Sequence, residues 1–178
     1  MTRNDWTYLL GLSTLMAITR FHHFSLLPDA SLAVFFLAGL WALPWGWAWF
    51  SALAVLIDYL AIRYGGVSSF CITPAYVFLL PTYGGMWLGG FLSRKKPPAV
   101  IFATLVSATL IAFLLSNLSF YAFSGYFAAT EFKTYAAQVL PYLAPYLLAP
   151  LTYVALILLL RLGFKTMANL LRVTLPAP

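Results

Sequence analysis

Residues 98–122 form a continuous run that carries no charged side chain. A transmembrane helix needs about 20 consecutive apolar residues, so this run is long enough to cross a bilayer. In the whole chain 63% of residues are hydrophobic and only 8% are charged, whereas about 25% of a soluble domain is charged. The sequence therefore predicts an integral membrane protein, and the length of the run favours the all-α class.

Prolines, glycines and charged residues divide the rest of the chain into further apolar segments. These segments predict six transmembrane helices, at residues 6–20, 30–43, 46–63, 75–92, 98–122 and 143–163. A short amphipathic piece is expected near residues 131–140. Since the remaining loops are too short for a soluble domain, we expect one transmembrane domain covering residues 1–178.

The distribution of basic residues over the loops predicts the orientation, because cytoplasmic loops are enriched in Lys and Arg. With cytoplasmic termini, that side holds seven basic residues: Arg3, Arg94, Lys95, Lys96, Arg161, Lys165 and Arg172. The opposite side holds three: Arg20, Arg63 and Lys133. We therefore expect both termini in the cytoplasm. The net charge of +6 is explained by this pattern and does not indicate a nucleic-acid partner.

In this orientation, polar and aromatic residues gather at the outward ends of the helices. Such a concave surface is typical of a capture site for a polar ligand with apolar parts. The candidate ligand-binding residues are His22, His23, Asp29, Ser68, Ser69, Phe70, Cys71, Thr73, Tyr121, Tyr126 and Tyr142.

Several of these residues also have a structural interpretation. The tyrosines are equally consistent with an aromatic belt at the membrane surface. Adjacent side chains on a helix point in different directions, which argues against metal chelation by both His22 and His23. Asp58 lies inside an apolar helix and needs a partner; we expect an ion pair with Arg63, which follows five residues later.

Small residues four positions apart let helices approach closely. Gly85 and Gly89 have this spacing, and we expect them to pack within the bundle. Ser13 and Ala17 have it too, and are a candidate docking face for a partner helix.

Cys71 is the only cysteine, so the chain has neither an internal disulfide nor a C-x-x-C metal site. A free cysteine is usually a small, inert, buried residue. Cys71, however, lies in a predicted outward loop with Gly65, Gly66 and Pro74, on the side where exposed thiols tend to oxidise. A nucleophilic role would need a neighbouring base such as His22 or His23. A further role is ligation, because a thiolate suits late transition metals. A single thiolate cannot hold a bare metal ion, but it can bind a metal that arrives inside its own chelator with one axial position open.

The chain resembles the substrate-binding (S) components of energy-coupling factor (ECF) vitamin transporters, and within them the BtuM-type cobalamin transporters. The resemblance covers almost the whole chain, although most of it is hydrophobic pattern. Asp58 in the third helix contributes to it, and its specific part is the cysteine loop. The motifs that carry it are Arg20-Phe21-His22-His23, Pro28-Asp29-Ala30-Ser31-Leu32-Ala33 and Ser68-Ser69-Phe70-Cys71-Ile72-Thr73-Pro74.

This resemblance implies a bacterial inner-membrane protein that takes up cobalamin, with Cys71 as the axial cobalt ligand on the lower face of the corrin. The corrin's own base would be displaced. As a hypothesis, the thiolate weakens the bond to the opposite ligand, so that cyanide is lost from cyanocobalamin as an ancillary reaction. Otherwise the expected role is transport and not catalysis.

The printed sequence has no G-x-x-x-x-G-K-[ST] nucleotide loop. Energy would come from an ECF ATPase module with a coupling subunit, docked through helix one, or from passive flow. Two other functions remain open at this point. One is an S-component for another vitamin, with Cys71 merely packed. The other is a membrane thiol enzyme that uses Cys71.

Overall fold

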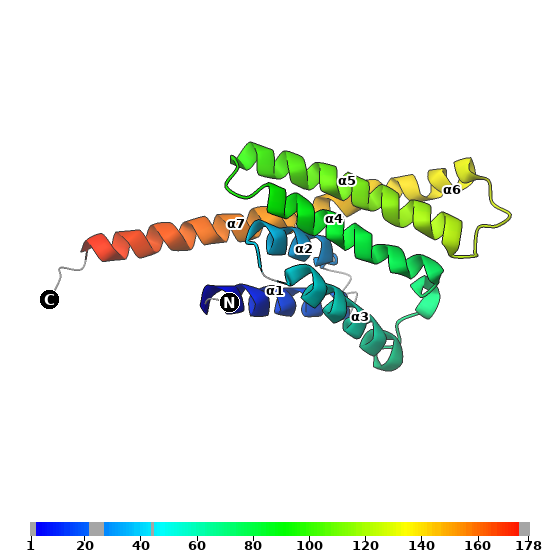
Figure 1. Ribbon diagram of the computed structural model, residues 1–178, viewed down its shortest axis with the longest axis horizontal. Helices are drawn as coiled ribbons and strands as arrows, with labels where there is room; N and C mark the ends of the chain where they lie inside the picture. The colour runs from blue at the N-terminus through cyan, green and yellow to red at the C-terminus, as the bar shows by residue number, and fades with distance from the viewer. Residues whose placement is uncertain (1–2, 22–26, 44, 175–178) are drawn as a thin grey trace.

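The computed structural model describes residues 3–21, 27–43 and 45–174, and most of these residues are helical, with no strand among them. The helices run back and forth along one long axis (Figure 1). In chain order they are α1 (Arg3–Phe21), α2 (Ser31–Leu40), α3 (Gly46–Tyr64), η1 (Ser69–Cys71), η2 (Pro74–Phe78), α4 (Leu79–Leu92), α5 (Pro98–Phe123), α6 (Phe132–Val139), η3 (Leu140–Tyr142) and α7 (Leu143–Thr174).

Each of the six predicted segments is helical in the structure, and three of them differ clearly from the expected bounds. α2 ends at Leu40, before Ala42 adopts a positive φ of 50°. The fourth segment starts as the 3-10 helix η2, and α4 begins only at Leu79. This start places Pro81 in the first turn of α4, where an α-helix has no intrahelical partner for an N–H. α7 continues to Thr174, well past the expected end at residue 163.

Three helical stretches in the described residues are long and apolar enough to cross a membrane. They are Gly46–Tyr64, Pro98–Phe123 and the run Phe132–Phe164. α2 is also apolar, but its 10 residues give a length of only about 15 Å, half the thickness of the hydrocarbon core. Its burial explains its composition: Phe35, Phe36 and Leu37 have no exposed surface.

α2 packs against α4 with the two backbones in direct contact. A Cβ atom at Gly90 would overlap the carbonyl oxygen of Phe36, and one at Gly39 would overlap the carbonyl oxygen of Trp87. The predicted pair has a smaller part in packing. A Cβ atom at Gly89 would lie 3.1 Å from Cβ of Ala108 in α5, and one at Gly85 would meet no atom within 4 Å.

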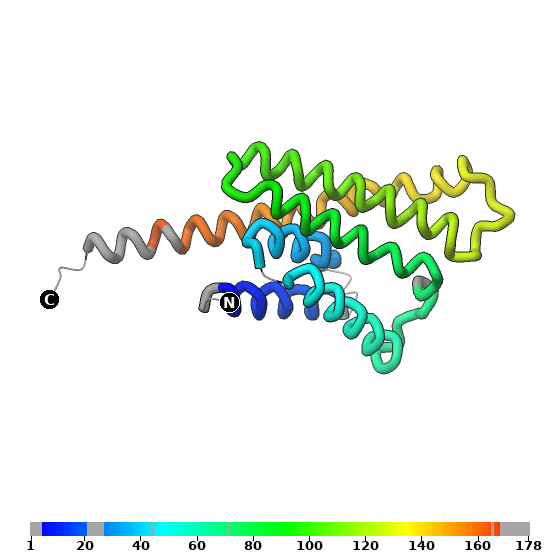
Figure 2. The backbone as a smooth tube through the Cα atoms, viewed as in Figure 1, coloured from blue at the N-terminus to red at the C-terminus, as the bar shows by residue number. Residues whose placement is uncertain are grey.

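Because successive helices run in opposite directions, the connections between them lie at two opposite ends of the molecule (Figure 2). The start of α1, the α2–α3 turn, the α4–α5 turn and the end of α7 lie toward one end of the long axis. The η1–η2 segment and the α5–α6 connection lie toward the other end. The predicted basic loop at Arg94, Lys95 and Lys96 is the α4–α5 turn, and it lies at the same end as the start of α1 and the end of α7.

Candidate functional site

A cavity of about 610 Å³ lies at the end of the bundle opposite the α4–α5 turn. It is lined by the last turns of α1, α3 and α5 and by the first turns of α2, α4 and α7. These turns meet because successive helices are antiparallel. The walls are largely apolar and aromatic: Ile62, Phe70, Ile72, Leu79, Phe113, Phe120, Pro145 and Pro150 are among the lining residues. Both the volume and this mixture are typical of small-molecule sites, which span about 300–1,000 Å³.

The polar floor of the cavity is built around Arg20, at the end of α1. Its Nε donates to Oδ1 of Asp58 at 2.6 Å, and its Nη2 donates to Oδ2 of the same carboxylate at 2.7 Å. The Arg20 side chain is only 9% exposed, and that of Asp58 is 21% exposed. This bidentate pair joins α1 to α3 and satisfies two charges that would be costly to bury singly.

Nη1 of Arg20 faces a second carboxylate and two hydroxyls. It lies 3.1 Å from Oδ2 of Asp29, 3.0 Å from Oγ of Ser31 and 3.0 Å from the hydroxyl of Tyr83. The other oxygen of Asp29, Oδ1, accepts from the Ser31 backbone N–H at 2.9 Å and from its hydroxyl at 2.6 Å. Asp29 thus anchors the start of α2 while its side chain stays 41% exposed.

Tyr76 extends the floor toward the cysteine loop. Its hydroxyl donates to Oδ2 of Asp58 at 2.6 Å, so η2 is tied to the carboxylate that holds Arg20. Outside the cavity lining, the Tyr153 hydroxyl of α7 donates to the Pro28 carbonyl at 2.7 Å, next to Asp29. Asp58 therefore joins α1, α3 and η2, and Tyr153 separately ties α7 to the segment before α2.

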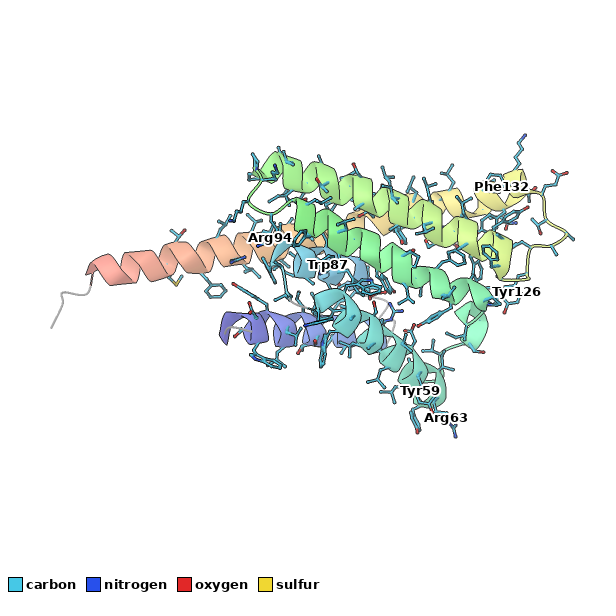
Figure 3. All side chains as sticks on the ribbon, viewed as in Figure 1. Tyr59, Arg63, Trp87, Arg94, Tyr126 and Phe132 are labelled. Carbon is cyan, nitrogen blue, oxygen red and sulfur yellow. The ribbon has the colours of Figure 1, made fainter. Side chains whose placement is uncertain are left out.

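The expected pair of Asp58 with Arg63 is wrong, since Asp58 binds Arg20. Residues five apart lie about 140° apart around a helix, so their side chains do not share a face. The Arg63 guanidinium lies 5.7 Å from the ring centroid of Tyr64, its neighbour in the chain. Figure 3 shows Arg63 at the outer end of α3 with its side chain turned away from the bundle.

The cysteine loop is shaped by two side-chain caps. The Ser68 hydroxyl accepts from the Phe70 N–H at 3.2 Å at the start of η1, and the Thr73 hydroxyl accepts from the Ala75 N–H at 3.3 Å at the start of η2. Such bonds are typical of Ser and Thr before a helix. Ser68 also lines the cavity, whereas Thr73 lines a smaller cavity of about 420 Å³ between α3 and α4.

Cys71 is the last residue of η1. Its side chain lies outside the described part of the structure, as do residues His22 and His23 altogether. Its two neighbours in the chain, Phe70 and Ile72, both line the cavity. Among the described residues, no group of three or more His, Cys, Asp and Glu side chains is arranged to hold a metal ion.

Aromatic contacts hold the cysteine loop against the far end of α5. The Phe70 ring stacks on Tyr126 with centroids 4.5 Å apart and an angle of 5°, and meets Phe120 edge-on at 5.7 Å. Tyr126 is labelled in Figure 3, next to the end of α5. Phe78 stacks on Phe123 in the same way at 4.9 Å. The loop that carries Cys71 is therefore docked on the segment that follows α5.

The predicted site residues thus separate into two groups. Asp29, Ser68, Phe70 and Tyr142 line the main cavity. Ser69, Thr73, Tyr121 and Tyr126 lie outside its lining. Of these, Tyr121 donates to the Thr130 carbonyl at 2.9 Å and so braces the α5–α6 connection.

Sequence reasoning did not select Arg20, Ser31, Tyr76, Tyr83 and Tyr146 as site residues, although all five line the cavity. Arg20 counted as a basic residue in the orientation argument and as part of the Arg20-Phe21-His22-His23 motif, but not as a site residue. A usable signal existed, because an arginine at the outward end of one apolar helix and an aspartate near the outward end of another are at similar depth.

Comparison of the chain with protein-family models and with curated proteins gives no match.

Proposed function

We propose that this protein takes up cobalamin across a bacterial inner membrane, with six transmembrane helices and both termini in the cytoplasm. Three helical stretches suitable for crossing a membrane support the membrane location. α1, α2 and α4 would complete the six passes, with α2 and α4 shielded from lipid by their neighbours. The cavity would then open to the outer side, opposite the basic α4–α5 turn.

The observation that carries the proposal is the position of Cys71 between two residues that line the cavity, Phe70 and Ile72. A corrin fills the four equatorial positions of its cobalt, so a protein needs to supply only one axial donor. A thiolate on this loop is a donor of that kind, and thiolates suit late transition metals. Apolar walls would receive the corrin faces, and the polar floor would receive its amide edge.

Capture also requires movement, because a corrinoid is a large ligand for a cavity of about 610 Å³. In the proposal, the three loops expected on the outer side, at residues 21–30, 64–74 and 123–142, open to admit it and close over it. The ligand is then released inside. The stacking contact between Phe70 and Tyr126 would be broken in the open form and made again in the closed form. Loss of cyanide from cyanocobalamin at Cys71 is an ancillary part of the proposal.

Energy coupling is proposed through an ECF ATPase module and its coupling subunit, which would dock on α1. Ser13, one of the two residues expected on this face, accepts a hydrogen bond from Nε1 of Trp49 in α3 at 3.0 Å. The neighbouring position Gly11 is open, with no atom within 4 Å of an added Cβ. A docking face on α1 would therefore be centred nearer Gly11 than Ser13.

The test is the absorption spectrum of the purified protein after incubation with cyanocobalamin and removal of free ligand. The matched variants are Cys71→Ala and, as a control in the same short helix, Ser69→Ala. We expect a retained chromophore with altered bands in the wild type and in Ser69→Ala, and its loss in Cys71→Ala. Equal binding with unshifted bands in all three would remove the cobalt–thiolate bond from the proposal. No binding by the wild type would overturn cobalamin as the ligand.

A further inference from the structure

Arg20 lines the cavity, and an arginine in a cavity usually indicates a site for a carboxylate or phosphate ligand. Here its donors are already used within the protein. Nε and Nη2 bind Asp58, and Nη1 faces Asp29, Ser31 and Tyr83. With 9% of its side chain exposed, Arg20 has little capacity to bind an anionic ligand.

The charge of the floor therefore comes from the carboxylates. The described charged residues that line the cavity are Arg20, Asp29 and Asp58, which gives one positive and two negative charges. The carboxylates are also the more accessible partners, since Asp29 is 41% exposed and Asp58 is 21% exposed. An ionised carboxylate accepts hydrogen bonds and donates none. The floor thus presents acceptors and an excess of one negative charge.

We infer that this floor selects ligands by charge: it accepts hydrogen-bond donors such as primary amides and rejects ligands that place a carboxylate there. This inference rests on the proposed function and specifies which part of the ligand meets Asp29. Cobalamin carries primary amides around the corrin edge, and each offers N–H donors to a carboxylate. Hydrolysis of one amide removes those donors and adds a negative charge next to Asp29.

The test compares cobalamin with its separate monocarboxylic acids, in each of which one side-chain amide is hydrolysed. Affinities are measured by calorimetry on the purified full-length protein at pH 8, where histidines with ordinary pKa values near 6.5 are neutral. We expect at least one acid to bind about 10- to 100-fold more weakly than cobalamin, because a like charge is placed against an acceptor.

Two variants test whether the charge of Asp29 causes the weaker binding of the acid. Asp29→Asn removes the excess charge, and its amide oxygen can still accept the Ser31 N–H that anchors α2. Glu131→Gln removes the same charge from the α5–α6 connection, at a residue outside the cavity lining. We expect the weakened acid to regain affinity in Asp29→Asn and to stay weak in Glu131→Gln.

The outcomes separate this inference from the proposed function. If all the acids bind the wild type as tightly as cobalamin, the inference is overturned and cobalamin uptake stands. If the discrimination survives unchanged in Asp29→Asn, Asp29 is not its cause and the inference, which places the amide against Asp29, is again overturned. If cobalamin itself does not bind, the proposed function fails, and this inference fails with it.

Discussion

Phe70 and Tyr126 stack with ring centroids 4.5 Å apart and nearly parallel planes, although they lie in different connections between helices. Phe70 precedes Cys71 in η1, and Tyr126 follows α5. The contact joins the cysteine loop to the α5–α6 connection at the end of the bundle where the cavity lies. It holds the cysteine loop against this connection, and a single substitution can remove it.

Removing this stack should expose the loop. Aromatic pairs contribute about 0.5–1.5 kcal/mol beyond the area they bury. We therefore expect Tyr126→Ala to speed the labelling of Cys71 by a membrane-impermeant maleimide by about 2- to 10-fold. Tyr126→Phe keeps the ring and should label like the wild type. Because Cys71 is the only cysteine, the signal has a single source. Equal labelling rates in Tyr126→Ala and the wild type would exclude the stack as a latch.

The pair of Arg20 and Asp58 should dominate the stability of the end of the bundle where the cavity lies. Removing one member of a buried ion pair typically costs about 3–5 kcal/mol, because the other charge is left without compensation. We expect Arg20→Ala to lower the midpoint of thermal unfolding in detergent strongly. Replacing both members, as in Arg20→Met with Asp58→Leu, should lower it less. Arg63→Ala, which removes a cation outside this network, should leave the midpoint close to that of the wild type.

The contact between the α2 and α4 backbones gives a second stability prediction. Gly90→Ala places a methyl group where the Phe36 carbonyl oxygen lies, and overpacking of this kind typically costs about 1–3 kcal/mol. Gly85→Ala adds the same methyl group into open space and improves helix propensity, so it should be neutral or stabilising. Thermal unfolding of the two variants in the same detergent measures the difference. Equal midpoints would contradict backbone contact between α2 and α4.

The orientation can be tested with single cysteines in intact cells. We expect Cys71 to react with an impermeant maleimide added from outside. In a Cys71→Ser background, a cysteine at Lys95 should react only after the membrane is permeabilised, because the α4–α5 turn carries the basic residues expected on the cytoplasmic side. Labelling of Lys95→Cys in intact cells would reverse the proposed orientation.

The helices could be predicted from sequence because their signal is local. An apolar run bounded by proline, glycine or charge identifies α3 and α5 without knowledge of their neighbours. The short α6 was predicted in the same way, from its amphipathic pattern near residues 131–140. Each of these features depends only on residues within one segment.

The site was predicted less well because its contacts join distant segments. Asp58 was paired with the nearest arginine in sequence, whereas its partner Arg20 lies 38 positions away. Likewise, the visible Gly85-x-x-x-Gly89 spacing marks one helix, while the closest helix contact involves Gly39 and Gly90 on two. The polar residues of the cysteine loop were predicted as ligand contacts. Ser68 and Thr73 also have a local role as helix caps that their sequence positions alone did not distinguish.

The pairing of Arg20 with Asp58 also has a consequence for biogenesis. α1 is synthesised before α3, so Arg20 is translated before its carboxylate partner Asp58. Charged residues are costly within a bilayer until they are paired. Stable placement of this end of α1 therefore depends on α3, because Asp58 binds two of the three donor groups of Arg20. A nascent chain that stops after α2 lacks this bidentate partner.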